Sequence, residues 1–432
     1  MPETTAAIFI LIGVFFVLLV CRVPVAIAMG VASIATYAYL GLPLSLVVQY
    51  TVGGANVFTF LAVPFFILGG ELINQGGIGE KLVDFANACV GWIPGGAALV
   101  NVMSSMFFGG ISGSAPADIA SIGPFEIKIM ESQGFDRDFS TGLTMASAVQ
   151  GMLIPPSHNL VIYACAAGSV SIAALFMAGL PAGIFLGIVL MVYSVYYAIR
   201  KKIRAAGRFN LKEVIKTGIS AFFGMMTIVI IFAGVVGGIM TATESAAIAA
   251  LWAFLCAWLI YRGIKLKDYY KIATSAVKML SMILILMAVA NAFGWVVAYL
   301  RIPNLVANAI PSITSNRYLI LLIIIAITLA LGCIMSISSL ILILTPILVP
   351  ILTALNVSLV HFGIVFILCM GIGLLTPPVG AALYVGAAVS GLSIGRTAKA
   401  LTPFYICLTA ALLLLTYIPT LSMWLPNLLG LT

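Results

Sequence analysis

The sequence predicts an all-α polytopic membrane protein with inverted structural repeats, two re-entrant helical hairpins and two broken helices. The first observation is composition: of 432 residues, 63% are hydrophobic and 7% are charged. Apolar runs recur along the whole chain, more than a soluble domain can bury. These runs are continuous, whereas the strands of an outer-membrane barrel alternate. The other two observations are an internal repeat and polar turns inside apolar segments.

The first apolar run, Met1–Cys21, resembles a secretion signal only superficially. It has no basic n-region and no A-x-A cleavage pattern. We therefore expect it to form the first membrane helix.

Basic residues are concentrated in two clusters that set the expected orientation. Seven of the twenty lie in residues 200–216 and five more between Arg262 and Lys278. Two apolar spans separate the clusters, so both fall on one face of the membrane, which the positive-inside rule makes cytoplasmic. Anionic lipids are the expected partners of the first cluster, through a short amphipathic helix on the membrane surface, and a purely topogenic role is equally compatible. Nucleic acid is not an expected partner.

An internal repeat relates the two halves at an offset of 222 residues. Residues 151–181 align with residues 373–403 without a gap, with nine of 31 positions identical, including both Pro-Pro pairs. Upstream, Gly110, Ser114 and Pro124 meet Gly332, Ser336 and Pro346 at the same offset. Each half thus contains a polar glycine-containing turn and, further on, a Pro-Pro break. Inverted repeats with interrupted helices mark the binding sites of secondary transporters.

The two Pro-Pro breaks predict sodium sites. Proline removes N–H donors and disfavours helix before it, so backbone carbonyls are freed at each break. Such carbonyls, with nearby hydroxyls, are hard oxygen ligands that suit Na⁺. With the hairpin turns they predict two pseudo-symmetric groups and at least two Na⁺. The candidate sodium-binding residues are Gly110, Gly151, Ile154, Pro156, Gly332, Gly373, Thr376 and Val379.

An anionic substrate is expected between these groups. Helix N-termini that follow each break direct partial positive charge to the same depth, and short polar side chains can orient oxygen atoms. The candidate substrate-binding residues are Ser112, Ser114, Asp118, Ser157 and Asn159. For Asp118, a structural role in capping the turn is equally compatible, because a carboxylate in an apolar helix is only a candidate functional group.

Other polar residues predict structure more than chemistry. Thr243 followed by Glu244 predicts a helix N-cap, and Gly109, Gly110 and Gly113 are expected to reverse the chain in the first hairpin. The seven cysteines and two histidines are isolated, so neither a disulfide framework nor a transition-metal site is expected. No carboxylate follows Tyr269, which disfavours a proton relay across both halves.

Five stretches give the chain a resemblance to the large membrane subunit of tripartite ATP-independent periplasmic (TRAP) transporters, of the sialic-acid and C4-dicarboxylate type. They are "LAVPFFILGGELINQGGI" (61–78), "GGISGSAPADIASIG" (109–123), "IPPSHNLVIY" (154–163), "TATESAAIAA" (241–250) and "LLTPPVGAALYVGAAVSGLSI" (374–394). They keep the family's order over nearly the whole chain. Ala242 stands where the family often has proline, and His158-Asn159 follows the first Pro-Pro in only some members.

The resemblance implies sodium-coupled uptake of an organic acid by an elevator mechanism. It also implies a fold like that of the ion transporter superfamily. It implies a small membrane (Q) subunit, a periplasmic binding protein, a bacterial inner-membrane location and sodium ligands on the hairpin turns and broken helices. The expected parts are N-terminal scaffold helices (1–75), a first transport repeat (76–200; hairpin 92–131, broken helix 138–168), a basic connection with scaffold helices (201–300), and a second transport repeat with C-terminal helices (301–432; hairpin 317–352, broken helix 359–390).

Two other functions remain open at this level. A stand-alone sodium/carboxylate symporter of the divalent-anion type shares the hairpin plan and needs no partner chain. An intramembrane enzyme would need a second ionisable group near Asp118, whereas Glu126 and Lys128 are expected near the outer end of the hairpin. We expect no enzyme. The particular acid, which would be an acidic sugar or a C4-dicarboxylate, and the oligomeric state do not follow from the sequence.

Overall fold

The computed structural model describes residues 2–21, 23–203, 209–265, 267–302, 305 and 316–431. Its regular elements over this part of the chain are all helical. The first half contains α1 (Pro2–Val20), α2 (Val25–Tyr39), α3 (Ser45–Ala55), η1 (Phe58–Leu61), α4 (Ala62–Gln75), α5 (Ile78–Val90), α6 (Gly96–Ser112), α7 (Ala115–Ser121), α8 (Gly123–Ser132), α9 (Arg137–Gln150), α10 (His158–Ala167) and α11 (Ile172–Arg200).

The remaining helices begin after the basic connection. They are α12 (Leu211–Val236), α13 (Ala242–Leu255), η2 (Cys256–Ile260), α14 (Tyr269–Tyr299), α16 (Arg317–Gly332), α17 (Ile337–Ala354), α18 (Leu359–Leu375), α19 (Ala381–Ser390), α20 (Ile394–Ala400), α21 (Thr402–Tyr417) and α22 (Thr420–Leu428). The start of the predicted second repeat falls mostly on residues outside the described ranges. So does the middle of the surface helix expected in residues 200–216.

Several helices are long and apolar enough to cross a membrane. Five qualify among the described residues, or six when the bent pair α20–α21 is taken as one span. Shorter apolar helices, including α6, α10, α16, α18 and α19, accompany them. The chain is therefore a multi-pass helical membrane protein, as predicted.

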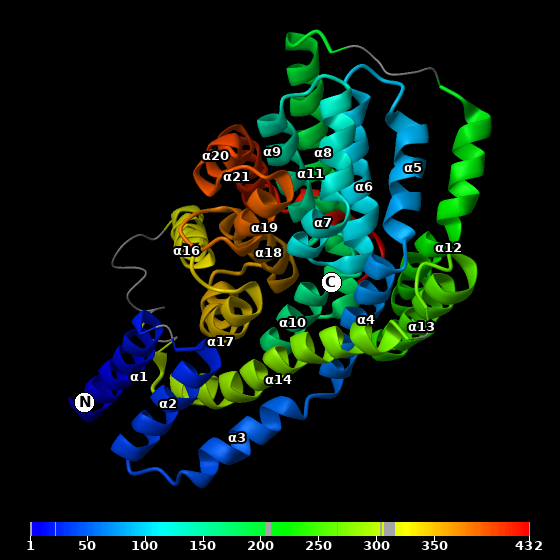
Figure 1. Ribbon diagram of the computed structural model, residues 1–432. Coiled ribbons are helices and arrows are strands. Elements are labelled where there is room, and N and C mark those ends of the chain that lie inside the picture. Colours follow the sequence, from blue (N-terminus) through cyan, green and yellow to red (C-terminus); the bar gives the residue numbers. More distant parts are fainter. Residues whose placement is uncertain are drawn as a thin grey trace.

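The helices around the two predicted breaks contact one another in a reciprocal pattern. Within each half, the first arm of the hairpin packs on the helix before the break, α6 on α9 and α16 on α18. Between the halves, the helix after each break packs on the returning arm of the other hairpin, α10 on α17 and α19 on α7. In Figure 1, α14 runs beneath this group at a steep angle to α6 and α11, and it contacts α2, α3, α4 and α17.

The first hairpin reverses at one glycine. Gly113 has a left-handed backbone (φ 62°) and its N–H donates to Gly109 O at 2.7 Å, which ends α6. The expectation that Gly109 and Gly110 also form the reversal is wrong, since both lie inside α6. Their lack of a side chain serves close packing instead: a Cβ on Gly109 would lie 2.0 Å from Gly151 Cα.

The helix that carries Glu244 is capped two residues earlier than expected. Thr241 is the N-cap of α13: its hydroxyl accepts from Glu244 N–H (3.2 Å), and the Glu244 carboxylate accepts from Thr241 N–H (2.7 Å). The prediction of Thr243 as the cap is therefore wrong, because a capping box needs Thr and Glu three residues apart. The structural role expected for Glu244 is confirmed.

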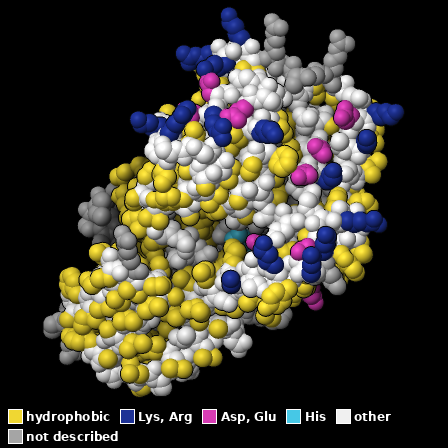
Figure 2. Space-filling view, viewed as in Figure 1, with side chains coloured by type: hydrophobic (Ala, Val, Ile, Leu, Met, Phe, Trp, Pro, Cys, Tyr) yellow, Lys and Arg dark blue, Asp and Glu magenta, His cyan; other side chains and the backbone are white. Residues whose placement is uncertain are grey.

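Charged side chains gather in two areas of the molecule, one of them at the end where α9 and α11 meet the basic connection. Figure 2 shows Lys and Arg toward this end and over the region of α13 and α14, whereas the part formed by α1, α2 and α3 is largely hydrophobic. At the end near α9 and α11, Asp136 pairs with Lys201 (2.8 Å) and accepts from Tyr197 (2.6 Å). These hydrogen bonds hold the pKa of the Asp136 carboxyl below its usual range.

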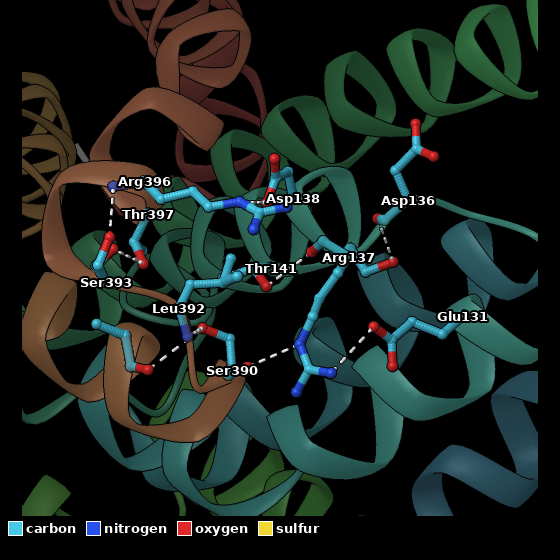
Figure 3. A network of polar contacts seen from close by, with 12 residues as sticks. Glu131, Asp136, Arg137, Asp138, Thr141, Ser390, Leu392, Ser393, Arg396 and Thr397 are labelled. Carbon is cyan, nitrogen blue, oxygen red and sulfur yellow. Dashed lines mark hydrogen bonds and ion pairs between the residues drawn. The ribbon is translucent and has the colours of Figure 1, made fainter.

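The same end also joins the two halves through polar contacts (Figure 3). Arg137, at the start of α9, donates to Ser390 O at the end of α19 (2.7 Å) and pairs with Glu131 (3.5 Å). Asp138 pairs with Arg396 of α20 at 2.8 Å. Segments more than 250 residues apart in the chain are thus held side by side.

Candidate substrate and cation site

The first Pro-Pro break is the segment from Gly151 to Ser157, between α9 and α10. All of its residues are buried. The hairpin lies directly against it, since a Cβ on Gly110 would lie 3.1 Å from Ile154 Cγ2 and 3.2 Å from Pro155 O. No described residue donates a backbone hydrogen bond to the carbonyls of residues 151–156. The predicted residues Gly110, Gly151, Ile154 and Pro156 thus lie together, with unpaired carbonyl oxygens of the kind that bind Na⁺.

The second break is the segment from Thr376 to Gly380, between α18 and α19. Gly373, in the last turns of α18, packs on Gly332 at the end of α16: a Cβ on Gly373 would lie 2.7 Å from Gly332 C. Val379 N–H and Gly380 N–H both donate to Cys333 O, at 3.2 and 3.3 Å. The predicted residues Gly332, Gly373, Thr376 and Val379 are therefore also brought together by the hairpin.

A cavity of about 360 Å³ lies between the two hairpin turns and both breaks. Its lining includes Ser114 of the first turn, Asn159 of α10, Gly332 and Ser336 of the second turn, and Val379 of the second break. Met279 of α14 completes one wall. No Lys, Arg, Asp or Glu is among the described residues that line it. Figure 2 shows a histidine side chain in a recess at the centre of the molecule.

Three helices of ten or more residues begin at this cavity: α10, α17 and α19. Ser336 caps α17 by accepting from Ser339 N–H (3.3 Å), whereas α10 and α19 have no side-chain cap. First-turn N–H groups of a helix have no partner within the helix and attract anions. The arrangement therefore favours an anion without a Lys or Arg side chain in the described lining.

The predicted substrate residues divide into two groups. Ser114 and Asn159 line the cavity, and Asn159 also donates to Gly113 O at 3.1 Å. Ser112 lies one step away, where its hydroxyl accepts from Ser114 N–H (3.4 Å). Ser157 is fully buried and, like Asp118, is not among the lining residues. The geometry therefore does not support direct substrate contact by Ser157 or Asp118.

Asp118 belongs instead to a buried polar group beneath the first hairpin. Neither of its carboxylate oxygens has a hydrogen-bond partner among the described residues. Glu126 is buried as well, where it accepts hydrogen bonds from Asn101 (3.0 Å) and Ser104. The expectation that Glu126 lies near the outer end of the hairpin is wrong, because α8 folds back along α6 and α9 and turns this carboxylate inward.

The cavity residues that sequence reasoning missed include His158, Met279 and Ser338. His158 directly follows the Pro-Pro break and belongs to the quoted motif, but a single histidine does not by itself indicate a binding site. Ser338 lies just after the repeat partner of Ser114. Met279 comes from a helix outside both repeats, so no sequence signal connects it with the cavity.

The fold and the cavity together define a multi-pass membrane protein with a transporter's architecture. A chain in the crystal structure of the Alcanivorax borkumensis YdaH transporter superposes with a TM-score of 0.66, over 91% of this chain and 89% of that one. The sequences are 14% identical, so this likeness concerns the fold alone.

Sequence comparison gives the family. Residues 12–421 match the family described as "Tripartite ATP-independent periplasmic transporter, DctM component", and the chain belongs to that family. The C4-dicarboxylate TRAP transporter large permease protein DctM of Pseudomonas aeruginosa is 38% identical over 87% of this chain and 88% of its own length. The sialic acid TRAP transporter large permease protein SiaM of Vibrio cholerae is 37% identical over 88% and 89%.

These relatives confirm the resemblance on which the sequence analysis relied. They are permease components of transporters, so the expectation that the chain is not an enzyme is also confirmed. They favour a tripartite transporter over a stand-alone symporter of the divalent-anion type.

Proposed function

We propose that this chain is the membrane component of a sodium-coupled transporter that takes up an organic acid across the bacterial inner membrane. A periplasmic binding protein delivers the acid, and a small membrane subunit accompanies the chain. The convergence of both hairpin turns and both Pro-Pro breaks on one cavity carries this proposal. The family membership supports the partners and the substrate class.

Sodium supplies the positive charge that the cavity lacks. Two groups of backbone oxygens flank a cavity whose described lining has no Lys or Arg side chain. An anion and cations then bind more favourably together than apart, which couples their transport. With two Na⁺ and a monoanion, one net charge enters, and the membrane potential adds about 2.3 kcal/mol per 100 mV.

The elevator mechanism is part of the proposal. The α6–α11 and α16–α19 helices contact each other reciprocally, and α14 contributes Met279 to the cavity from outside this group. A rigid group sliding along α14 would expose the cavity to each side in turn, and the inverted repeat supplies two equivalent arrangements.

Reconstitution in proteoliposomes tests the proposal. The chain, its small subunit and its binding protein are assayed for uptake of a panel of organic acids, with an inward gradient of Na⁺ or of K⁺. Uptake is expected only with Na⁺, and only when all three components are present. Uptake that is equal in K⁺ contradicts sodium coupling, and uptake by the chain alone would instead identify a stand-alone symporter.

A further inference from the structure

We propose that the acid carried is a small monoanion with an apolar carbon skeleton, such as a short aliphatic carboxylate, and not a sugar acid or a dicarboxylate. This inference rests on the proposed function, because it assigns the substrate class of that same cavity. It comes from the cavity's size and from the way polar and apolar groups divide its wall.

The cavity has room for one small molecule. Its volume of about 360 Å³ is near the lower end of the range for ligand pockets, roughly 300 to 1,000 Å³. Met279 of α14 lines it together with residues of the two hairpin turns.

The polar groups of the wall suffice for one anionic group. Ser114 and Ser338 have no hydrogen-bond partner for their side-chain hydroxyls in the described structure, and the Asn159 amide uses one donor on Gly113 O. Ser336 is already engaged, since its hydroxyl bonds to Ser339 at 2.6 Å. Together with the N–H groups that begin α10 and α19, these groups can hold one carboxylate.

The rest of the wall is apolar. Met152, Met279, Ile334, Met335, Ile337 and Leu374 line it, and none offers a strong hydrogen-bonding group. Each hydroxyl of a sugar acid placed against them loses its hydrogen bonds to water without a replacement, which weakens binding. A second carboxylate there would be a desolvated charge without a partner. An aliphatic chain has no such penalty, and methionine adapts readily to its shape.

His158 adds a polar side chain to the part of the cavity that is expected to hold the carboxylate. The ring lies at the start of α10, and a Cβ on Gly113 would come within 3.1 Å of His158 Nδ1, so the ring is held against the first hairpin turn. Apart from Cys333, His158 is the only ionisable side chain among the described lining residues. The imidazole ring therefore lies beside Ser114 and Asn159, at the polar part of the cavity wall.

Calorimetric titration of the purified full chain with its small subunit in lipid nanodiscs tests the inference. The probes are 4-methylpentanoate, succinate and gluconate, each titrated in NaCl and in KCl. We expect 4-methylpentanoate to bind at least about tenfold more tightly than the others in NaCl, the size of effect that apolar contacts in a pocket provide. Tighter binding of succinate or gluconate in NaCl overturns the inference and leaves the proposed function standing. Binding that is independent of Na⁺, or binding of none of the acids, overturns both.

Three methionine variants test whether the apolar wall of the cavity contacts the carbon skeleton of the acid. Met335→Gln and Met279→Gln are each expected to weaken 4-methylpentanoate about tenfold without weakening gluconate. Met282→Gln is the matched control on α14, because Met282 is 75% exposed and does not line the cavity; no change is expected. Unchanged affinity in both cavity variants contradicts the inference.

Thiol labelling of Cys333 is a second measurement, which does not depend on whether the methionine variants fold. Cys333 lines the cavity, so a chain that keeps Cys333 and has its other six cysteines replaced by alanine reports occupancy directly. In NaCl, 4-methylpentanoate is expected to slow thiol labelling of Cys333 at lower concentration than gluconate does. The reverse order contradicts the inference.

Discussion

The two Pro-Pro breaks share a sequence motif and differ in their surroundings. At the first break, Pro155 and Pro156 are buried, and the break packs against α11 and the first hairpin. At the second, Pro377 and Pro378 are exposed and Thr376 is half-buried. Gly179 and Gly183 of α11 account for part of the cover, because a Cβ on either would lie within 2.4 Å of Leu153 O or Ile154 Cγ1.

The carbonyls of the two breaks differ as well. Those of residues 151–156 accept no backbone hydrogen bond from the described residues. At the second break, Leu375 O accepts from Tyr405 (2.6 Å) and Pro378 O from Tyr384 (3.2 Å). We therefore expect the carbonyl oxygens of the first break to bind Na⁺ without rearrangement. Those of the second break must first give up their hydrogen bonds to tyrosine. A repeat in sequence can thus yield one preformed site and one adaptable site.

The largest effect is expected from adding a methyl group to the first hairpin. In Gly109→Ala the new Cβ would lie 2.0 Å from Gly151 Cα, and backbone on both sides cannot move aside as a side chain can. Destabilisation of about 3 kcal/mol or more is expected, seen as loss of the folded peak in size-exclusion chromatography. The matched control is Gly332→Ala, whose Cβ meets Gly373 Cα at an ordinary 3.4 Å. Equal stability of the two variants would show that the halves are packed alike.

Thiol labelling tests the difference in exposure directly. Val379 is 47% exposed and lines the cavity, whereas Ile154 is 6% exposed. Val379→Cys, in a chain whose native cysteines are replaced by alanine, is expected to react rapidly with a small membrane-permeant reagent, and Ile154→Cys only slowly. Labelling of both at one rate indicates that the first break opens as readily as the second.

Sodium affinity should depend on a side chain in one half only. The Thr376 hydroxyl, which donates to Ile372 O at 2.8 Å, presents its oxygen at the second break, where Ile154 occupies the repeat-related position in the first. Thr376→Val removes a ligand for a cation, so the Na⁺ concentration for half-maximal uptake is expected to rise about tenfold. Ile154→Val keeps the backbone ligands and should leave it unchanged. An unchanged value in Thr376→Val removes this residue from the sodium site.

Asp118 has no counterpart in the second half, where Leu340 occupies its position. Because its carboxylate makes no hydrogen bond in the described structure and lies near Glu126, replacement by Asn loses no partner and removes one buried acid. We expect Asp118→Asn to keep substrate affinity and to stabilise the fold by about 1 kcal/mol, as measured by calorimetry and thermal unfolding. A large loss of substrate affinity would support direct contact between Asp118 and the substrate.

The sequence contained the information for the helices, the breaks and a few of the lining residues, among them Ser114 and Asn159. Proline pairs and glycine turns act locally, so the breaks and the hairpin reversal near Gly113 follow from the motif itself. Whether a residue is buried depends instead on contacts with segments that are distant in the sequence. The inward turn of Glu126 depends on α8 folding along α6, and the cover over Pro155 depends on two glycines in α11. Asp118 was proposed as a substrate ligand for the same reason: sequence gives its depth in the membrane and not its direction.

The smallest effect concerns the polar end where the two halves meet. Asp136 links the α8–α9 turn to α11, and Lys201 and Tyr197 keep its pKa low. A carboxylate with a depressed pKa in the folded state stabilises at pH above its unfolded pKa of about 3.9, and the stabilisation is lost as pH falls through the folded value. Since Asp136 is about half exposed, Asp136→Asn should cost less than about 1 kcal/mol.

The melting temperatures of wild type and Asp136→Asn should therefore differ slightly at pH 7 and converge below about pH 4. Asp138→Asn removes the pair that spans the halves and should be equally mild, because its pair with Arg396 is exposed too. Cohesion between the halves comes instead from buried contacts: a Cβ on Gly363 would lie 2.5 Å from Tyr163 Cε1. A larger loss in Asp138→Asn than in Asp136→Asn would assign that cohesion to the ion pair.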